Sequence, residues 1–164
     1  MTYQSSSLPT VIDKILTAFR GLSLSPLQVS VFDGFMGPDQ PDNFVVVGGS
    51  LDPTIDGVEG WATVGGTAAV VGEAYAVSVT ISCYVGGSDA SSAANPQKQA
   101  RDNAFSIFNA FVAVLRADSS FGGTVTDSHV EALRFDQTSS ESLSVEQGRE
   151  AAITFRVAVE NYLS

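Results

Sequence analysis

Residues 73–85 alternate strictly between two kinds of side chain, and this alternation constrains the fold more than any other feature of the sequence. Every second residue from Tyr75 to Val85 is apolar, and most of the residues between them are small or polar. A period of two is that of a β-strand with one buried face. Residues 148–162 repeat the pattern, with Ile153, Phe155 and Val157 on one face. Both segments are therefore predicted to be half-buried strands.

Two other segments carry the period of a helix. Across residues 8–22 the apolar side chains fall on one face, with Pro9 suited to the first helical position and Gly21 to the end. Asn95 and Pro96 open a second, longer helix, which ends at residues 118–123. Its apolar positions predict a broad stripe packed against a sheet. They are Phe105, Phe108, Val112 and Leu115, widened by Ile107, Phe111 and Val114.

The remaining segments are predicted to be short strands and loops. Strands are expected at residues 27–32, at residues 44–49 (buried) and at residues 124–135 (irregular). Loops are expected at residues 35–42, 50–72, 86–94 and 136–147. The second of these is glycine-rich, and a short strand at residues 61–64 is the one regular element considered within it.

The order of these elements predicts an α+β fold. Two helices pack on one face of a mixed or antiparallel sheet, forming a sandwich with long flexible loops. Residues 1–164 are interpreted as a single domain, because the length suits one domain and no internal repeat is present.

The charge of the chain excludes some partners. Eight Lys and Arg residues stand against 18 Asp and Glu residues, giving a net charge of −10. Stable binding to nucleic acid or to an anionic membrane uses several basic side chains, so neither is expected. Between Gly21 and Gln97 there are acidic residues but no Lys or Arg. Their spacing does not fit a calcium loop, and a solvated, repulsive surface is the simpler interpretation.

The sequence offers little for catalysis. A single cysteine, Cys83, and a single histidine, His129, exclude an internal disulfide and a zinc site built from several Cys or His ligands. Asp127, His129 and Glu131 share one strand face and could form a general-base group, but no nucleophile motif accompanies them. A surface histidine on an edge strand is the simpler reading. No enzyme activity, metal or cofactor is expected.

No membrane-spanning or secretory segment is expected either. No apolar run approaches the roughly 20 residues that cross a bilayer. The N-terminus also lacks the basic and apolar regions of a signal peptide.

Trp61 stands in the glycine-rich loop, and two interpretations of it are equally supported. Either the side chain packs onto the core, or it anchors a protein partner.

Five segments, in order along nearly the whole chain, carry a resemblance to a known family. They are residues 9–16, residues 29–34 leading into 44–48, residues 73–83, the helix from Ala100 and Arg101, and residues 148–157. In these patterns of hydrophobicity and turns the chain resembles the tail terminator proteins of long-tailed, siphovirus-like bacteriophages, especially those of actinobacterial hosts.

The resemblance implies a structural protein of the virion, assembled in the bacterial cytoplasm and located at the tail–neck junction. Such proteins form a hexameric ring on the head-proximal end of the tail tube. They stop tube growth and present the surface that the head–neck completion proteins join. The genome passes through the ring without stable binding, which an acidic protein would allow.

For the contact with the tail tube protein, we predict the loop that contains Asp56, Glu59 and Trp61. The second candidate is the Ser- and Glu-rich segment 139–147, with Glu141 and Glu146. Another neck, head–tail connector or tail-completion protein is the nearest alternative function. A small ligand-binding domain or an enzyme of the host is the alternative from a different class.

Overall fold

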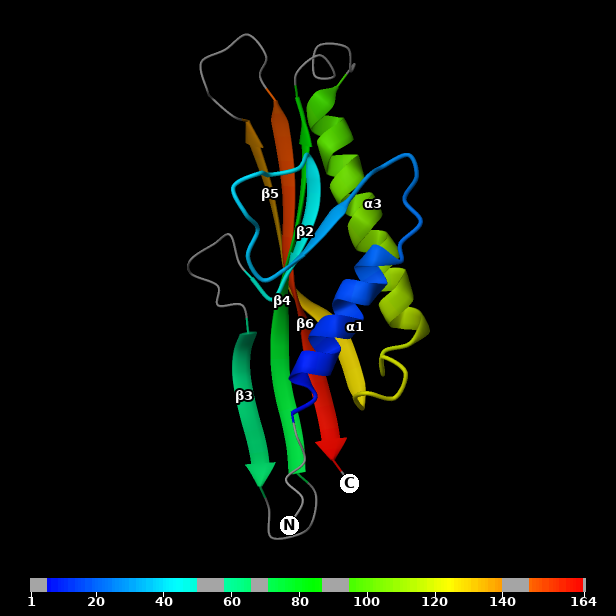
Figure 1. Cartoon of the computed structure of the whole chain (residues 1–164), viewed down its shortest axis with the longest axis vertical. Helices are drawn as coiled ribbons and strands as arrows, with labels where there is room; N and C mark the ends of the chain where they lie inside the picture. The colour runs from blue at the N-terminus through cyan, green and yellow to red at the C-terminus, as the bar shows by residue number, and fades with distance from the viewer. Residues whose placement is uncertain (1–5, 50–57, 66–70, 87–94, 140–147, 164) are drawn as a thin grey trace.

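The computed structural model of the chain describes residues 6–49, 58–65, 71–86, 95–139 and 148–163. Within these ranges it contains two helices and a six-stranded sheet (Figure 1). In chain order the elements are α1 (Leu8–Arg20), β1 (Ser30–Asp33), β2 (Asn43–Val47), β3 (Val58–Gly65), β4 (Val71–Val85), α3 (Pro96–Ala117), β5 (Asp127–Ser139) and β6 (Arg149–Leu163).

The sheet is mixed, with strand order β1-β2-β4-β6-β5. β1 and β2 are parallel, and the other pairings are antiparallel. The two long alternating segments are the central pair: β4 and β6 are matched from Val71 opposite Leu163 to Val85 opposite Arg149. The other edge of β4 is shared, because β2 pairs with its second half and β3 with its first half. The predicted α+β fold is confirmed.

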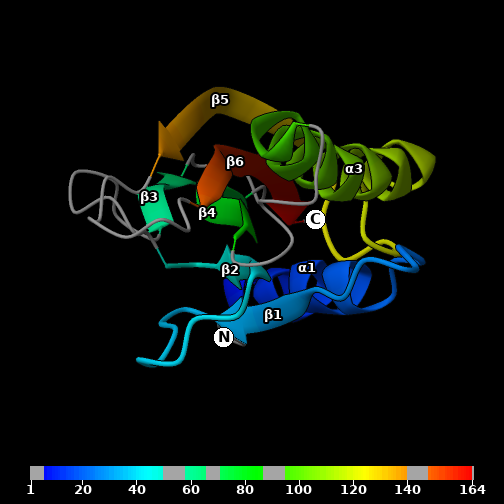
Figure 2. The same ribbon diagram turned by 90° about the horizontal axis from the view of Figure 1, so that it is seen from above.

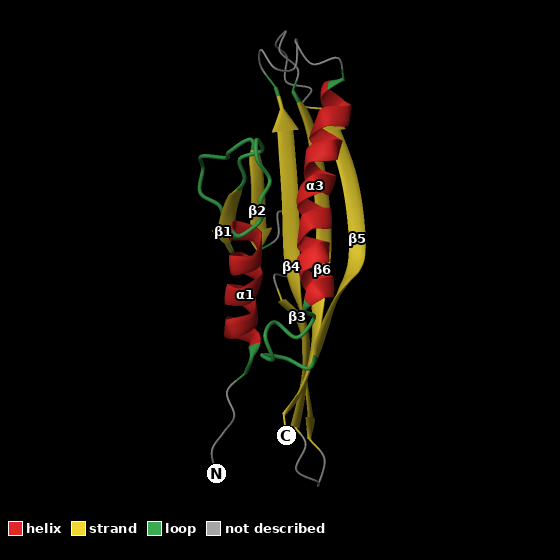
Figure 3. Ribbon diagram, turned by 90° about the vertical axis from the view of Figure 1, so that its right-hand side faces the viewer, coloured by secondary structure: helices red, strands yellow, loops and turns green. Residues whose placement is uncertain are grey.

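Both helices lie on one face of the sheet (Figures 2 and 3). The face of β4 that carries Val77, Val79 and Ile81 packs with the matching apolar face of β6 and with the buried sides of both helices. The ring of Phe19 in α1 stacks on that of Phe111 in α3, with centroids 4.3 Å apart. Such a pair adds about 0.5–1.5 kcal/mol beyond its buried area, so it joins the two helices to one core.

The ends of α1 follow from its sequence and from one long-range contact. Pro9 lies in the first turn, and the N–H of Gly21 bonds to the Thr17 and Ala18 carbonyls at the other end. Ser7, the N-cap residue, donates both its backbone N–H and its hydroxyl to the Glu73 carboxylate, at 3.0 and 2.7 Å. This buried carboxylate at the start of β4 therefore fixes where the helix begins.

The long helix α3 begins as predicted, and the stripe that it buries is narrower than the predicted one. The side chain of Asn95 accepts a hydrogen bond from the Lys98 N–H at 2.9 Å, as an N-cap does. The buried residues of α3 are Ala100, Ala104, Ile107, Phe111 and Leu115. Of the four residues that defined the predicted stripe, only Leu115 belongs to the buried set. Phe105, Phe108 and Val112 lie on the flank, and Val114 is exposed. The predicted packing against the sheet is confirmed for the buried Ile107, Phe111 and Leu115, and Phe105 and Phe108 pack at the edge of the core. Only the exposed Val114 was wrongly included.

β4 is buried on both faces over much of its length, although one solvated face was expected. Ser78, Thr80 and Ser82 on the second face are all buried. The backbone partners of Ser82 and Thr80 in β2 are Phe44 and Val46, which form a second small cluster with Met36 and Phe32. Alternation in the sequence reports which face is apolar, but small polar residues are also buried once larger neighbours cover them.

The predicted loop at residues 50–72 was wrong over residues 58–65, which form β3 and contain the short strand considered at 61–64. It was also wrong at residues 71–72, where β4 begins. Residues 50–57 and 66–70 lie outside the described part. β5 begins at Asp127, three residues later than predicted, and extends over residues 136–139 of the predicted loop. β1 is shorter than predicted and begins at Ser30. Neither described helix is both long and apolar enough to cross a bilayer.

Candidate interaction surfaces

The residues predicted to contact the tail tube fall at the β3 edge and beyond the described residues. Glu59 and Trp61 lie in β3, not in a loop. Asp56, Glu141 and Glu146 lie outside the described residues, as do the side chains of Glu59 and Trp61. The prediction that these residues meet a partner therefore stays a prediction.

The backbone of β3 is irregular at Trp61. Glu59 lies opposite Ala76 and Ala62 opposite Ala74, so three steps along β3 match two along β4. One extra residue is accommodated in the Gly60–Trp61 step, which makes it a β-bulge. Bulges bend a strand and re-aim a side chain, and they occur preferentially at sheet edges. The bulge gives a structural reason for a glycine beside the tryptophan at this edge.

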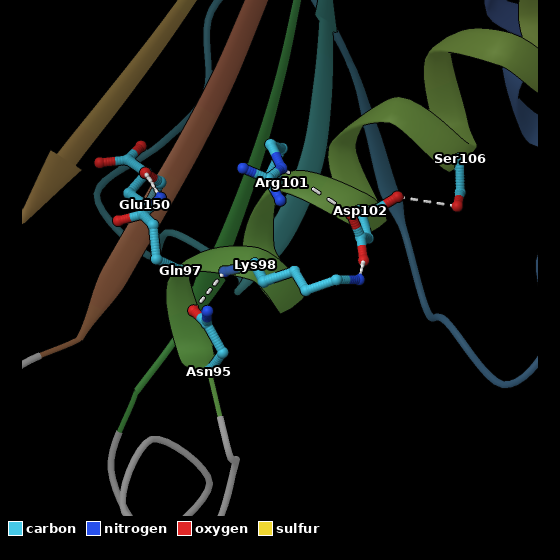
Figure 4. Close-up of polar contacts among 7 residues, drawn as sticks. All are labelled: Asn95, Gln97, Lys98, Arg101, Asp102, Ser106 and Glu150. Atoms are coloured by element: carbon cyan, nitrogen blue, oxygen red, sulfur yellow. Dashed lines mark hydrogen bonds and ion pairs between the residues drawn. The ribbon is translucent and has the colours of Figure 1, made fainter.

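A polar pocket of about 310 Å³ lies where β2, β4 and the start of β6 meet. Its lining includes Glu150, whose carboxylate accepts a hydrogen bond from the buried Ser82 hydroxyl at 2.6 Å. The Glu150 backbone carbonyl accepts a bond from the Gln97 side chain at 3.3 Å, which ties the first turn of α3 to β6 (Figure 4). The remaining lining residues are Gln40, Pro41, Asp42, Phe44 and Tyr84.

Two cations in the first turns of α3 are paired with an acid of the same helix. Lys98 forms an ion pair with Asp102 one turn later, and Arg101 approaches the same carboxylate at 3.8 Å (Figure 4). Because all three side chains are substantially exposed, these pairs contribute little to stability. The lining of the pocket offers the carboxylates of Asp42 and Glu150, a phenol and one side-chain amide, which suit a polar or cationic group more than an anion.

The sequence-predicted group at His129 is an exposed site on the edge strand β5. Asp127, His129 and Glu131 share a sheet face as expected, since they are matched with alternate residues of β6. His129 Nε2 is 4.0 Å from a Glu131 oxygen, and both side chains are about half exposed. No group of three metal-ligating side chains occurs among the residues that the structure describes. The geometry matches the edge-strand interpretation.

Cys83 is buried within the apolar face of β4, as expected. Burial raises the pKa of its thiol to about 12, because removal from solvent disfavours the charged thiolate. A thiol in this state is a poor nucleophile. Cys83 is therefore a packing residue.

Sequence reasoning missed one buried polar network, around Glu73. The single proton of the Ser7 hydroxyl goes to Glu73, so the Tyr75 hydroxyl, 2.8 Å away, is the donor to Ser7. Burial opposes ionisation of Glu73, but the hydrogen bonds from Ser7, Ser6 and Asn161 outweigh it and lower the pKa. Nothing local in the sequence marks this contact, because Ser7 and Glu73 are far apart along the chain.

Sequence reasoning also left two exposed apolar residues unassigned. Phe35, directly after β1, is 89% exposed, and Leu133 in β5 is 51% exposed.

Comparison of the chain with protein-family models and with curated proteins found no match.

Proposed function

We propose that this chain is a tail terminator of a long-tailed bacteriophage. In this role it forms a hexameric ring at the tail–neck junction of the virion. It binds the tail tube protein, stops tube polymerisation and provides the surface for the head–neck completion protein. The residue patterns that resemble the family support this assignment, and the chain acts without catalysis or a cofactor.

The observation that carries the proposal is the open arrangement of the sheet. β1 and β5 stand at its two ends, each paired on one side only among the described strands. A subunit with an open edge at each end can meet a neighbour on both sides, which a ring requires. The net charge of −10 suits a ring through which DNA slides, because a negative surface repels phosphate.

The deciding experiment is electron microscopy of tails from a phage lacking this gene. Overlong tubes of irregular length without heads are expected. Tails of normal length beside unjoined heads would instead assign the chain to another neck, connector or completion role. Expression of the wild-type chain from a plasmid should restore normal tails and serves as the control.

The tube contact is tested separately with Trp61→Ala, which should impair tail termination if the β3 edge meets the tube. Tyr162→Ala is the matched control, because Tyr162 is an exposed aromatic residue on another strand. Normal tails with Trp61→Ala would overturn the assignment of this edge. They would leave the terminator function itself intact.

The polar pocket at Glu150 favours one competing function, the binding of a small polar ligand. A thermal-shift screen distinguishes the two functions. A ligand present at 100 times its Kd adds about 2.7 kcal/mol to the free energy of unfolding. Strong stabilisation by a metabolite, lost in Glu150→Gln, would support a ligand-binding domain.

A further inference from the structure

One exposed aromatic residue projects from a firmly anchored loop. Phe35 lies in the segment between β1 and β2 and is 89% exposed, whereas its neighbour Met36 is 9% exposed and packs on Phe44 and Val46. Met36 therefore holds the loop against the sheet while the ring of Phe35 faces solvent. An isolated chain gains nothing from exposing a whole aromatic ring, whereas such a ring is a strong anchor in an interface.

An apolar groove lies at the other end of the sheet, between α3 and β5. It has a volume of about 690 Å³ and is lined by Phe108, Asn109, Val112, Ala113, Arg116, Val130 and Leu133. Glu131 lies opposite Arg156 and Arg134 opposite Thr154, which places a bulge at Ala132 and Leu133. Ala132 has a φ of 51°. The bulge leaves Leu133 half exposed at the rim of the groove.

The loop and the groove complement each other in charge as well as in polarity. Asp33, Asp39 and Asp42 surround Phe35 in the sequence, and no Lys or Arg occurs between Gly21 and Gln97. The groove carries the exposed Arg116 in the last turn of α3. An acidic loop that presents an aromatic ring matches an apolar groove that carries a cation.

One molecule does not bring these two surfaces together. The loop follows β1 and the groove borders β5, and these strands stand at opposite ends of the strand order. Figure 2 shows residues 34–42 and β5 at opposite edges of the sheet. A second copy of the chain would bring the matching surface to each of them.

We propose that the Phe35 loop of one copy docks in the α3–β5 groove of the next copy. A contact between two different surfaces is heterologous, so repeating it closes a ring or extends a filament. This inference gives the proposed ring a specific subunit contact and in that respect rests on the proposed function. The physical complementarity of the two surfaces does not depend on the phage role.

The test is disulfide trapping between two single-cysteine additions. Chains carrying Phe35→Cys are mixed with chains carrying Leu133→Cys under a mild oxidant, and covalent heterodimers are resolved by non-reducing electrophoresis. Native Cys83 is left in place because it is buried. The matched control replaces Leu133→Cys with Val114→Cys, an exposed apolar position on α3 that does not line the groove. We expect at least a tenfold faster heterodimer formation with Leu133→Cys.

If Phe35→Cys formed heterodimers with Leu133→Cys and with Val114→Cys at equal rates, the proposed contact would be overturned. Adding Arg116→Glu to the Leu133→Cys chain should slow the reaction several-fold, and an unchanged rate would overturn the charge argument. The gene-deletion experiment separates this inference from the proposed function. Trapping at Phe35 and Leu133 with tails of normal length in the deletion strain would overturn the terminator role alone. Overlong tails without trapping would overturn this contact alone.

Discussion

The ring of Tyr84 occupies the space where a side chain on Gly148 would lie. A Cβ built on Gly148 would come within 1.9 Å of the Tyr84 hydroxyl oxygen and within 2.0 Å of its Cζ atom. Tyr84 lies near the end of β4, opposite Glu150 of β6. The aromatic ring therefore covers the backbone just before β6 begins, and it also lines the Glu150 pocket.

Gly148→Ala should destabilise the protein by about 1 kcal/mol, the low end of overpacking penalties, because the partly exposed Tyr84 ring must move to admit a methyl group. The penalty should shrink in a Tyr84→Ala background, where the space is free. Urea unfolding of the four chains of this double-mutant cycle measures the coupling. Gly37→Ala is the control, since its added Cβ would meet nothing within 4 Å. The same penalty in both backgrounds would contradict the packing described above.

Glu73 should make stability depend on acid pH. Its pKa is lower in the folded chain than its ordinary value of 4.5, so the folded state favours the ionised form. Its contribution is fully present above about pH 4.5 and is lost as the pH falls through the folded-state pKa. Glu73→Gln should flatten this part of the stability curve and cost about 1–3 kcal/mol at pH 7. The control is Asp13→Asn, on the exposed side of α1, which should leave the dependence of stability on pH as it is in the wild type. If Asp13→Asn flattened it as much as Glu73→Gln does, Glu73 would not be the group responsible.

Cys83 should resist thiol reagents until the chain unfolds. With a pKa of about 12, almost none of the buried thiol is ionised at pH 8, whereas an unfolded cysteine has a pKa of roughly 8.5. Labelling with iodoacetamide at pH 8 should therefore be slower by orders of magnitude in buffer than in denaturant. Its rate should follow the unfolding transition measured by circular dichroism. Rapid labelling under native conditions would show that the sheet opens locally.

The N-cap of α3 should contribute measurably to stability. Asn95→Ala removes the bond to the Lys98 N–H and should cost about 0.5–2 kcal/mol. Asn109→Ala is the matched control, because Asn109 is exposed in the middle of the same helix, where alanine is the better helix former. Thermal unfolding should therefore show a lower Tm only for Asn95→Ala. A similar loss in both variants would mean that Asn95 acts through something other than the cap.

The sequence by itself determined the elements whose pattern is local. The alternation in β4 and β6, the apolar faces of α1 and α3, and the Pro and Asn signals at the helix starts all reflect the geometry of a few neighbouring residues. These signals predicted both helices, the central strands and the α+β class. They also placed Cys83 on the buried side of β4.

Only the tertiary structure decided the features that depend on distant partners. β3 forms because the first half of β4 has an edge that β2 does not reach, and its glycine-rich sequence gave little sign of this. Packing against the strands determines which residues of α3 are buried. The Ser7–Glu73 and Tyr84–Gly148 contacts join residues that are far apart in the chain. Periodicity records which residues are apolar, whereas pairing and packing depend on which edges, faces and cavities the rest of the fold leaves free.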